Sequence, residues 1–531
     1  MDGFFAGLDV STQSTKLVVI DAGAGTVIHV DVVNYDEDLP HYGTRDGTIP
    51  DLGEGVSESD PRMWLEAVDT LLGRLKMSRI RGEEIRALAV SGQQHGLVAL
   101  DADGELARPT AKLWNDFSTH EECQLLTDAV GGDEAMIAEV GNTQRTGYTA
   151  PKILHLKRHE PENYERAATL FLVHNYINWY LTGGPDGGVR VMEPGDTSGT
   201  ALWHPRHREF SGLVLAAISP ELRSKLPPVR SSDETIGTLA PALAERFGLS
   251  PTCRIDAGSG DNMYGAIGTG NYAPGIVTVS LGTSGTAYTF MEEPFIDPTG
   301  EIAAFCDATS HWLPLLCVSN MANGYAAVRR EFDLDHEAFD DLVQKGETTN
   351  GSRILVPWYE GERTPDLPLA APVCFGFSPG DFTPENLCRA VLDGHVLNLW
   401  AGFSRMPVEP RQIHLTGGLT RSRAWGCAIS EIFGAETVPV EGEGAALGAA
   451  IHAAWVWFKE ADKPVPLAEL AEPLLQFDTG RRCRPRPETR AARDLQKRLY
   501  LAVTSRLRGL EGEDPFALRH ALLTLNRENG S

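Results

Sequence analysis

The sequence predicts an α/β protein built from two lobes, and three observations lead to that prediction. The chain has 531 residues, a length that favours two or more domains. Short apolar runs of strand length alternate with longer segments whose apolar residues recur at helical spacing. Each half of the chain also carries a turn rich in Gly, Ser and Thr, at residues 7–16 and 280–286, which is expected to join two strands.

The two turns match in composition and in setting. The first reads Gly-Leu-Asp-Val-Ser-Thr-Gln-Ser-Thr-Lys and the second reads Ser-Leu-Gly-Thr-Ser-Gly-Thr. Each continues into another apolar run, at residues 17–20 and 287–290. Such a turn can direct backbone N–H and hydroxyl groups at one point, which suits an anion and phosphate above all. One turn in each half therefore predicts two lobes that hold one phosphorylated ligand between them.

Further strands are expected where short apolar runs end at polar or Gly-rich turns. The run at 85–90 ends in Ser-Gly-Gln-Gln-His-Gly, and a later run ends in Thr-Gly-Gly, residues 416–418. A strand at 253–257 leads into Gly-Ser-Gly-Asp-Asn and marks the expected domain boundary. The remaining expected strands are 3–21 (two strands around the first turn), 26–33, 97–100, 412–415 and 437–440.

Helices are expected where apolar residues follow helical spacing. Residues 35–62, 105–120 and 193–200 are polar and are expected to form loops. After about residue 485 the chain is charged and helical, and this tail is expected to be peripheral. The expected helices are 61–77, one starting near residue 119, 160–182, 263–267, 387–405, 424–433 and one opening at 442–448.

Charge and composition limit the partners of the chain. The formal net charge of −26 argues against nucleic acid or an anionic membrane surface as a partner. The 8 Cys residues show neither C-x-x-C nor zinc spacing, so free thiols in a reducing compartment are expected. No signal peptide or membrane-spanning run is recognisable, and the expected location is cytoplasmic.

Seven short motifs, taken together and in this order, resemble the FGGY carbohydrate kinases, and among them the xylulokinases. The motifs are Asp9-Val-Ser-Thr, Gly92-Gln-Gln-His-Gly, Trp114-Asn-Asp, Gly260-Asp-Asn, Ser280-Leu-Gly-Thr-Ser, Glu362-Arg-Thr-Pro and Gly417-Gly. The resemblance covers roughly residues 4–460. It implies two actin-like ATPase domains of the ribonuclease-H-like fold with a deep cleft between them. The expected limits are 1–256 for the sugar-binding lobe, 257–485 for the ATP-binding lobe and 486–531 for the helical tail.

The resemblance also implies an activity, the ATP-dependent phosphorylation of D-xylulose on its 5-hydroxyl, with Mg²⁺ as cofactor. Asp261 occupies the position of the family's general base, and its Gly-flanked loop lets a substrate approach closely. On local sequence alone, Asp261 could equally be a helix N-cap. Asp9, which follows a buried strand, is expected to hold Mg²⁺ beside the phosphates, although an Asp here can also simply form the turn.

The other expected site residues fall into two groups. Gln94, His95, Asp116 and Asn262 are expected to bind the sugar, and the resemblance favours His95 as a ketose ligand, although a lone His is usually structural. The Met of enteric relatives is replaced by Gln94, so sugar contacts can differ there. For Lys16, the sequence allows either phosphate binding or a surface role. For the glycines, it allows either close approach of a nucleotide or tight packing of helix against strand. The residues expected to bind ATP and its phosphates are Thr12, Ser14, Lys16, Gly282, Thr283, Ser284, Gly417 and Gly418.

Two alternatives remain open on the sequence. A sister kinase would act on another ketose or polyol, such as ribulose, glycerol or gluconate. A non-catalytic ATP-binding sugar sensor would share the scaffold, although the retention of Asp9 and Asp261 weighs against it. The expected partners are a small ketose and ATP, with no nucleic acid and no membrane. The resemblance allows a homodimer, and the sequence carries no decisive interface signal.

Overall fold

The structure is a computed structural model that describes residues 3–442 and 444–528, and it divides into two compact units. Unit 1 comprises Met1–Tyr272, Phe290–Pro314 and Gly442–Leu475. Unit 2 comprises Ala273–Thr289, Leu315–Glu441 and Gln476–Ser531. These units do not follow the expected limits 1–256 and 257–485, because two later segments belong to unit 1: 442–475, whose helix α17 packs on the sheet, and 290–314, which bonds to Asn142 and Ser198.

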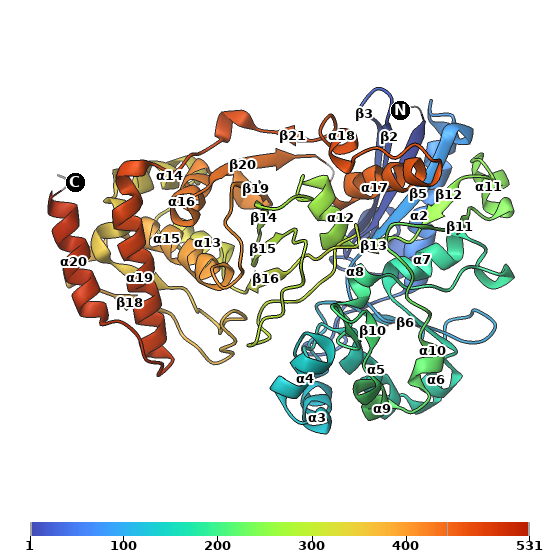
Figure 1. Ribbon diagram of the computed structural model, residues 1–531, viewed down its shortest axis with the longest axis horizontal. Helices are drawn as coiled ribbons and strands as arrows, with labels where there is room; N and C mark the ends of the chain where they lie inside the picture. The colour runs from blue at the N-terminus through green and yellow to red at the C-terminus, as the bar shows by residue number, and fades with distance from the viewer. Residues whose placement is uncertain (1–2, 443, 529–531) are drawn as a thin grey trace. The chain divides into compact units, whose positions relative to one another are not determined.

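Unit 1 is built on a seven-stranded sheet with the order β11-β12-β5-β1-β2-β3, in which β13 also pairs with β5 (Figure 1). Strands β1, β2 and β3 are antiparallel, whereas β5 is parallel to β1 and β12 is parallel to β5. The strands are β1 Phe4–Val10, β2 Ser14–Asp21, β3 Thr26–Asn34, β5 Ile85–Gly92, β11 Thr235–Thr238, β12 Arg254–Asp256 and β13 Ser259–Gly260.

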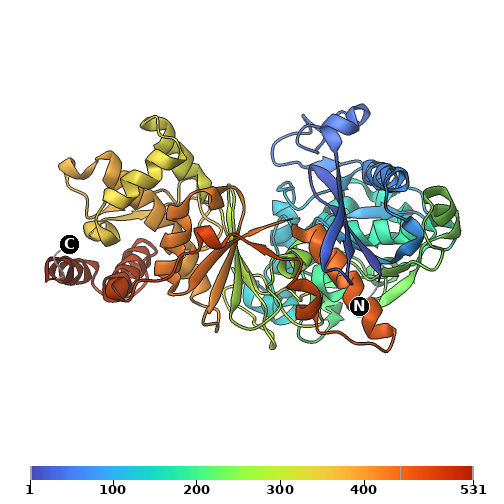
Figure 2. The ribbon, with the colours of Figure 1, turned by 90° about the horizontal axis from the view of Figure 1, so that it is seen from above.

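Alternate residues of β1 face opposite sides of this sheet, as the period of a strand requires. Leu8 and Val10 lie in the core that also holds Trp64 of helix α2. Phe5 stacks its ring near Trp457 of helix α17, on the other side. Helix α17 packs along β1, β5 and β2 and is seen from above in Figure 2. Both faces of the sheet are therefore covered, which explains the nearly continuous apolar runs in its central strands.

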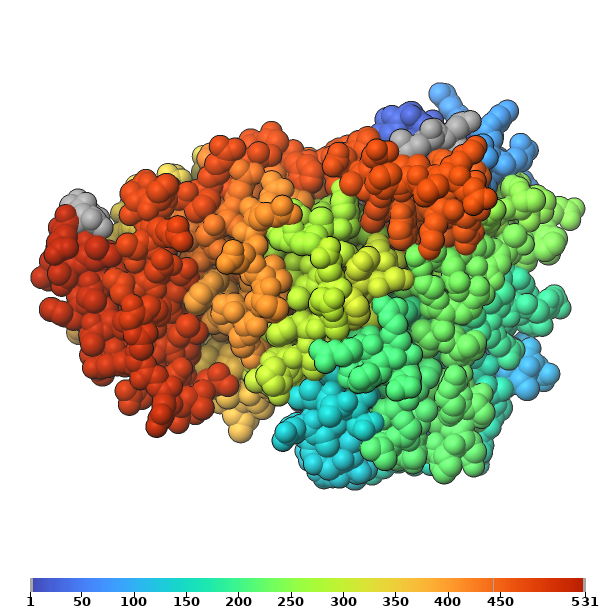
Figure 3. Space-filling model, viewed as in Figure 1, coloured from blue at the N-terminus to red at the C-terminus, as the bar shows by residue number. Residues whose placement is uncertain are grey.

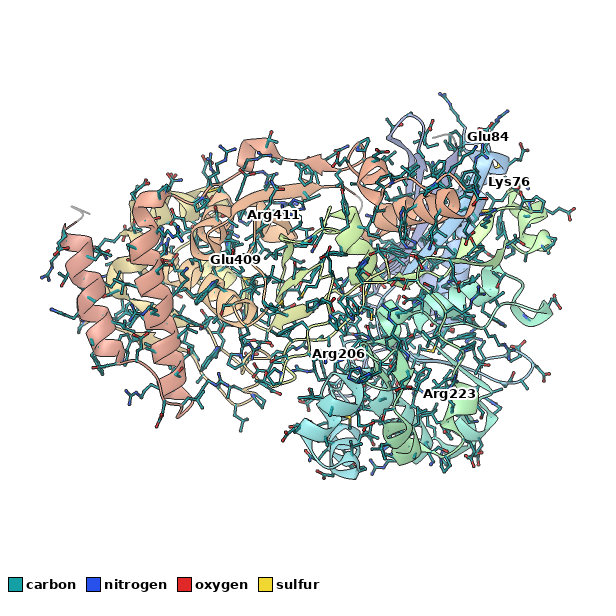
Figure 4. All side chains as sticks on the ribbon, viewed as in Figure 1. Lys76, Glu84, Arg206, Arg223, Glu409 and Arg411 are labelled. Carbon is teal, nitrogen blue, oxygen red and sulfur yellow. A yellow bond between two sulfur atoms is a disulfide. The ribbon has the colours of Figure 1, made fainter. Side chains whose placement is uncertain are left out.

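Helices and short strands complete unit 1. Helix α2 ends close to α11, where the Lys76 ammonium donates to the Arg246 carbonyl oxygen at 2.7 Å (Figure 4). The helices are α1 Tyr35–Asp38, α2 Pro61–Met77, α3 His120–Val130, α4 Asp133–Val140, α5 Thr149–His159, α6 Pro161–Arg166, α7 Val173–Leu181, α8 Pro194–Thr197, α9 Gly212–Ile218, α10 Leu222–Lys225, α11 Pro241–Phe247, α12 Asp261–Gly268, α17 Gly444–Glu460 and α18 Leu467–Ala471. The short strands are β4 Glu58–Ser59, β6 Val98–Leu100, β7 Ala111–Lys112, β8 Thr169–Phe171, β9 Trp203–His204 and β10 Glu209–Phe210.

Unit 2 repeats the topology of unit 1. Its six-stranded sheet has the order β16-β15-β14-β19-β20-β21, with the first three strands antiparallel, β14, β19 and β20 parallel, and β21 antiparallel to β20. This is the order of β3, β2, β1, β5, β12 and β11 in unit 1. The strands are β14 Ile276–Leu281, β15 Gly285–Thr289, β16 Leu315–Val318, β19 Gln412–Thr416, β20 Glu436–Glu441 and β21 Gln476–Phe477, with a separate pair β17 Ile354–Val356 and β18 Val373–Phe375.

The repeat makes the two Gly-, Ser- and Thr-rich turns equivalent. The first joins β1 to β2, and the second joins β14 to β15. Each is therefore the hairpin turn of the first two strands of its sheet, as the sequence predicts. The helices of unit 2 are α13 Ala322–Glu331, α14 His336–Lys345, α15 Pro384–Phe403, α16 Arg423–Phe433, α19 Arg490–Leu507 and α20 Pro515–Glu528.

The C-terminal tail is helical, as expected, but α19 is packed into unit 2 rather than attached to its surface. Leu499 and Tyr500 of α19 are at most 1% exposed. The Arg493 guanidinium is also buried and donates to Asp393 of α15 at 2.8 Å and to Glu431 of α16 at 2.9 Å. The space-filling view in Figure 3 shows the outer side of α19 and α20, in dark red.

Several local expectations differ from the structure. The segment 160–182 is not one helix, because strand β8 lies between α6 and α7 and pairs with β6. The polar segment 193–200 contains the short helix α8 rather than only loop. Cys427 and Cys483 form a disulfide, whereas the sequence predicts free thiols. No helix among the described residues is long and apolar enough to span a membrane.

Candidate active site

Asp9 lies near the end of β1, in the centre of the unit 1 sheet. Its register partner on β2 is Lys16, and its partner on β5 is Ser91. The Ser11 hydroxyl donates to Asp9 Oδ2 at 2.7 Å, and the Ser91 hydroxyl donates to Oδ1 at 2.8 Å. Burial raises the pKa of Asp9, while these two bonds and the charge of Lys16 oppose the rise. The strand register thus places Asp9 and Lys16 opposite each other at the first turn.

Asp261 is the first residue of helix α12, and the N-cap position is occupied by Gly260. Asp261 is therefore not the N-cap residue itself, although its side chain accepts from an N–H group of the first turn of α12. Its Oδ1 accepts from the Asn262 N–H at 2.8 Å and from Asn262 Nδ2 at 3.1 Å. Burial and the charges of Asp9 and Asp196 raise the pKa of Asp261 to about 8.

Asn262 links Asp261 to Gln94. The amide Nδ2 of Asn262 donates to Gln94 Oε1 at 2.6 Å. Gln94 Nε2 is buried and has no hydrogen-bond partner within the described part of the chain. A Cβ on Gly260 would lie 2.6 Å from Gln94 Cγ, so a glycine is needed for this close approach. Three of the expected site residues therefore form one hydrogen-bonded group.

His95 is held in a left-handed backbone conformation, with φ of 63°. Its N–H donates to Asp196 Oδ1 at 3.1 Å, and its carbonyl oxygen accepts from the Lys152 ammonium at 2.9 Å. A non-glycine residue in this conformation persists only where its surroundings fix it, and such residues concentrate at functional sites. Lys152 and Asp196 provide that fixation.

The ring of His95 is also fixed. Its Nδ1 lies 2.9 Å from Asp196 Oδ1. The ring packs against Tyr148 and Phe305, at centroid distances of 5.1 Å and 5.5 Å, and a Cβ on Gly199 would overlap it. Burial lowers the pKa of His95, against the opposing effect of Asp196. A neutral ring whose Nδ1–H faces Asp196 keeps a lone pair on Nε2 as an acceptor.

Two further groups of this cluster were not assigned from the sequence. Lys152 of α5 is fully buried, and burial lowers its pKa to about 7. Glu193 caps α8 by accepting from the Gly195 and Asp196 N–H groups, and burial raises its pKa to about 7. The polar Gly-rich sequence at 193–200 was a signal for Glu193 and Asp196. Lys152 follows Pro151 in an ordinary amphipathic helix, and no local pattern marks it.

Asp116 is placed differently from the sugar-binding group. It is fully buried, and its carboxylate accepts from the Ser57 N–H at 2.9 Å, from Lys112 Nζ at 3.1 Å and from the Ser118 hydroxyl at 2.6 Å. These bonds fix the loop that carries Trp114. Asp116 therefore supports the fold of this loop, and its role toward the sugar stays a prediction.

The first hairpin turn borders an open cavity of about 470 Å³ in unit 1. Thr12 and Ser14 line it, together with Trp114, which is 42% exposed. The Trp114 indole N–H donates to the Thr12 hydroxyl at 3.0 Å. Trp114 is thus a wall of this cavity rather than a core residue.

In unit 2, the two turns expected to bind phosphate lie against each other. The turn of Gly282, Thr283 and Ser284 is closed by a bond from the Gly282 N–H to the Ser284 carbonyl at 3.1 Å. Gly417 has φ of 93°, and a Cβ there would lie 2.5 Å from the Leu281 carbonyl oxygen. The Leu281 backbone thus leaves no room for a side chain at position 417, which requires glycine. Gly418 has open space around its Cβ position.

Asp9 fits the chemistry of a magnesium ligand, since it is a carboxylate at a phosphate-type turn. No group of three or more His, Cys, Asp or Glu side chains that could hold a metal occurs among the described residues. Mg²⁺ usually keeps water and substrate phosphates as ligands beside one or two carboxylates.

A repeated sheet of this order, with helices on both faces and a Gly-rich hairpin turn in each half, is the two-domain actin-like ATPase fold. The chain matches the N-terminal domain of the FGGY family of carbohydrate kinases over residues 4–268 and its C-terminal domain over residues 277–457. The chain belongs to the FGGY family of carbohydrate kinases. It is thus a phosphotransferase that acts on a sugar, as the motifs predict, and the predicted fold is confirmed.

Individual relatives agree with this assignment. The chain is 32% identical to a xylulose kinase from Haemophilus influenzae, over 91% of this chain and 95% of the relative. It is 36% identical to a xylulose kinase from Streptomyces coelicolor, over 84% of this chain and 87% of the relative. The solved xylulose kinase from Bifidobacterium adolescentis is 27% identical with a TM-score of 0.79, covering 93% of this chain and 99% of that chain. A solved gluconate kinase from Lactobacillus acidophilus, 22% identical, shares the fold with a TM-score of 0.81 and covers 95% of this chain and 98% of that chain.

Proposed function

We propose that this chain transfers the γ-phosphoryl group of ATP to the 5-hydroxyl of D-xylulose. The observation that carries the proposal is the similarity to xylulose kinases along most of the chain. The buried polar group of Gln94, His95, Asp261 and Asn262 in unit 1 supports it, since it offers donors, acceptors and a carboxylate to one small polar ligand.

Asp261 is proposed as the general base. Both bonds from Asn262 end on Asp261 Oδ1, which leaves Oδ2 to accept the proton of the sugar hydroxyl. A base with a pKa near the working pH is best matched to this task, and burial brings Asp261 into that range. Asn262 holds the carboxylate in one orientation, so little reorganisation is needed as the proton moves.

Gln94 and His95 are proposed to recognise the ketose. Gln94 Nε2 is a buried donor that has no partner among the described residues, and it would donate to the sugar carbonyl oxygen. His95 Nε2, kept as an acceptor by Asp196, would accept from a neighbouring hydroxyl. Such a donor and acceptor pair discriminates against sugars of the wrong configuration, because a mismatch leaves a buried polar group unpaired.

Phosphate binding is proposed for the turns that contain Thr12 and Ser14 in unit 1 and Thr283 and Ser284 in unit 2. Their backbone N–H and hydroxyl groups would bind the phosphoryl oxygens, and Lys16 would add a positive charge. Mg²⁺, when bound, neutralises charge on the phosphates, and Asp9 would hold it. Phosphoryl transfer depends mainly on such positioning and charge neutralisation.

A coupled ADP-release assay with ATP and Mg²⁺ tests the proposal. D-xylulose, D-ribulose, L-ribulose, glycerol and gluconate are compared by kcat/KM. We expect a clear preference for D-xylulose. A preference for another substrate would reassign the sugar but keep the kinase, and this outcome matters because the gluconate kinase shares the fold. ADP release that no sugar increases would contradict the proposal.

A further inference from the structure

A buried carboxylate in unit 2, Glu362, has no role in the chemistry proposed above. It is 3% exposed, and several backbone and side-chain donors converge on it. The Ser319 and Arg363 N–H groups donate to Oε1 at 2.5 Å and 2.7 Å, and the Asn320 and Asn398 side-chain amides donate to Oε2 at 3.1 Å and 2.9 Å. An ionised carboxylate accepts bonds at both oxygens, so this arrangement matches the charged form of Glu362.

On one side, Glu362 is connected to the C-terminal helix. Asn398 belongs to α15, and its Oδ1 accepts from the Trp358 indole at 3.0 Å and from the Tyr500 hydroxyl at 3.0 Å. These two donors fix the oxygen of the Asn398 amide, and therefore direct its NH₂ group toward Glu362. Tyr500 lies on α19, which packs along α15 in Figure 1. Helix α19 thus orients the Asn398 side chain, which is connected to Ser319 through two successive hydrogen bonds by way of Glu362.

On the other side, Glu362 holds the segment that supports the second hairpin turn. Ser319 and Asn320 are bonded to Glu362, and the next two residues, Met321 and Ala322, both donate their N–H groups to the Thr283 carbonyl oxygen, at 3.1 Å and 3.2 Å. The Met321 side chain also occupies the space where Gly285 would carry a Cβ. The segment 319–322 is therefore a rigid support between Glu362 and the turn.

The bonds to Thr283 determine the direction of the next N–H group. The peptide between Thr283 and Ser284 is planar and trans, so its N–H points opposite to its carbonyl oxygen. Because the carbonyl faces the start of α13, the Ser284 N–H faces away from α13, on the exposed side of the turn. A donor fixed in advance binds a phosphate more tightly than one that must first be ordered.

We propose that Glu362, Asn398 and Tyr500 are positioning residues for nucleotide binding. Their hydrogen bonds, which begin at Tyr500 on helix α19, fix the orientation of the Thr283–Ser284 peptide before the nucleotide binds. The inference rests on the proposed function, since it takes the turn of unit 2 as a phosphate site. It gives the Glu-Arg-Thr-Pro motif and part of residues 486–531 a function. None of the three side chains need touch the nucleotide, because the segment 319–322 transmits their effect.

The variant Glu362→Gln is the first test, since Gln keeps the shape but replaces one acceptor oxygen by an NH₂ group that opposes the converging donors. Isothermal titration with MgADP and with D-xylulose measures the two affinities separately. We expect the Kd of MgADP and the KM of ATP to rise on the order of tenfold. The Kd of D-xylulose is expected to stay within about twofold, because the sugar group lies in unit 1.

Tyr500→Phe is the second variant, which removes one hydroxyl and keeps the packing of α19. We expect a change in the same direction, about two- to fivefold in the Kd of MgADP. Tyr325→Phe is the matched control: Tyr325 is 2% exposed in unit 2, and its hydroxyl pairs with His336, outside the network. It should leave the Kd of MgADP unchanged.

Three outcomes would overturn the inference. In the first, folded Glu362→Gln and Tyr500→Phe bind MgADP as the wild type does. In the second, the Tyr325→Phe control weakens MgADP as much as Tyr500→Phe, or D-xylulose affinity falls in parallel, which would indicate a general loss of stability. In the third, wild-type protein binds no MgADP, which would overturn the proposed function as well and is recognised before any variant is made. If Glu362→Gln does not fold, Tyr500→Phe decides alone.

Discussion

Asp261 combines three properties in one side chain: burial, nearby negative charge and a neighbour that orients it. Its pKa is raised to about 8 by burial and by the charges of Asp9 and Asp196, against hydrogen bonds from Asn262 that lower it. Because a carboxyl with a raised pKa is mostly protonated at neutral pH, the fraction able to accept a proton grows as the pH rises.

The pH dependence of the reaction follows from this increase in the deprotonated fraction of Asp261. We expect kcat/KM for D-xylulose to rise with pH through neutrality, to reach half its maximum near pH 8 and to level off above that pH, because kcat/KM reports the pKa of the free protein. Rates measured between pH 6 and 9 at fixed Mg²⁺ test this. A profile that is flat over this range, or that falls as the pH rises, would contradict Asp261 as the base.

Substitution of Asp261 separates binding from turnover. Asp261→Asn keeps the volume but cannot accept the proton, so we expect kcat to fall by about 10²–10⁴ while D-xylulose still binds. Turnover and calorimetric sugar binding measure the two effects. Asp103→Asn, in an exposed turn of unit 1, is the control and should retain full turnover. Near-normal turnover in Asp261→Asn would require another base.

At the scale of elements, glycine brings α12 and α17 together. A Cβ on Gly448 of α17 would overlap the Tyr264 carbonyl oxygen of α12 and lie 2.9 Å from the Gly268 nitrogen. Gly7 of β1 is crowded by the backbone of α17 in the same way. The small residues at 442–448, interpreted from the sequence as either nucleotide-binding or packing residues, include Gly448, which serves helix packing in unit 1.

The contact between α12 and α17 at Gly448 leaves no room for an added methyl group. We expect Gly448→Ala to destabilise unit 1 by about 1–3 kcal/mol, because backbone atoms cannot move aside as side chains can. Thermal unfolding followed by circular dichroism measures the shift. The matched control is Gly73→Ala in α2, where nothing lies within 4 Å of the Cβ position, and which should be neutral or stabilising by up to about 1 kcal/mol. An equal response of the two variants would contradict the packing role of Gly448.

At the scale of the whole molecule, the two units repeat one topology, and the chain returns from unit 2 to unit 1 to contribute α17. Buried charge attaches the C-terminal tail to unit 2. Arg493 of α19 is bonded to Asp393 and Glu431, and Arg389 also pairs with Asp393, at 3.1 Å. Burial alone would raise the pKa of Asp393, but Arg389 and Arg493 hold it at about 2.

Loss of Arg493 would leave Glu431 and Asp393 without their shared partner. We expect Arg493→Ala to destabilise unit 2 by about 3–5 kcal/mol, the usual cost of breaking a buried ion pair from one side. This corresponds to a Tm decrease on the order of 10 °C. Arg490→Ala, at the exposed start of α19, should change Tm little. A tail that contributes nothing to unit 2 would give the same Tm for both variants.

Local pattern in the sequence was sufficient for many of the elements. Helix α2 has the predicted bounds, because Trp64, Leu71 and Leu75 recur at helical spacing after a Pro at its first turn. The hairpin turns of both sheets also follow from residue type, as predicted. These features depend on neighbours in the chain, so local sequence can reveal them, whereas the roles of Asp261, Gln94 and His95 rest on the family resemblance and stay predictions.

Tertiary structure alone determined the rest, because it depends on residues far apart in the chain. Asp116 bonds to Ser57 and Lys112, and no spacing in the sequence predicts that the Ser57 backbone reaches it. Lys152 of α5 and Asp196 of α8 form hydrogen bonds with the His95 backbone, and no spacing in the sequence predicts either contact. Likewise, α17 lies in unit 1 and α19 in unit 2 because long-range burial, which has no period along the chain, decides where each helix packs.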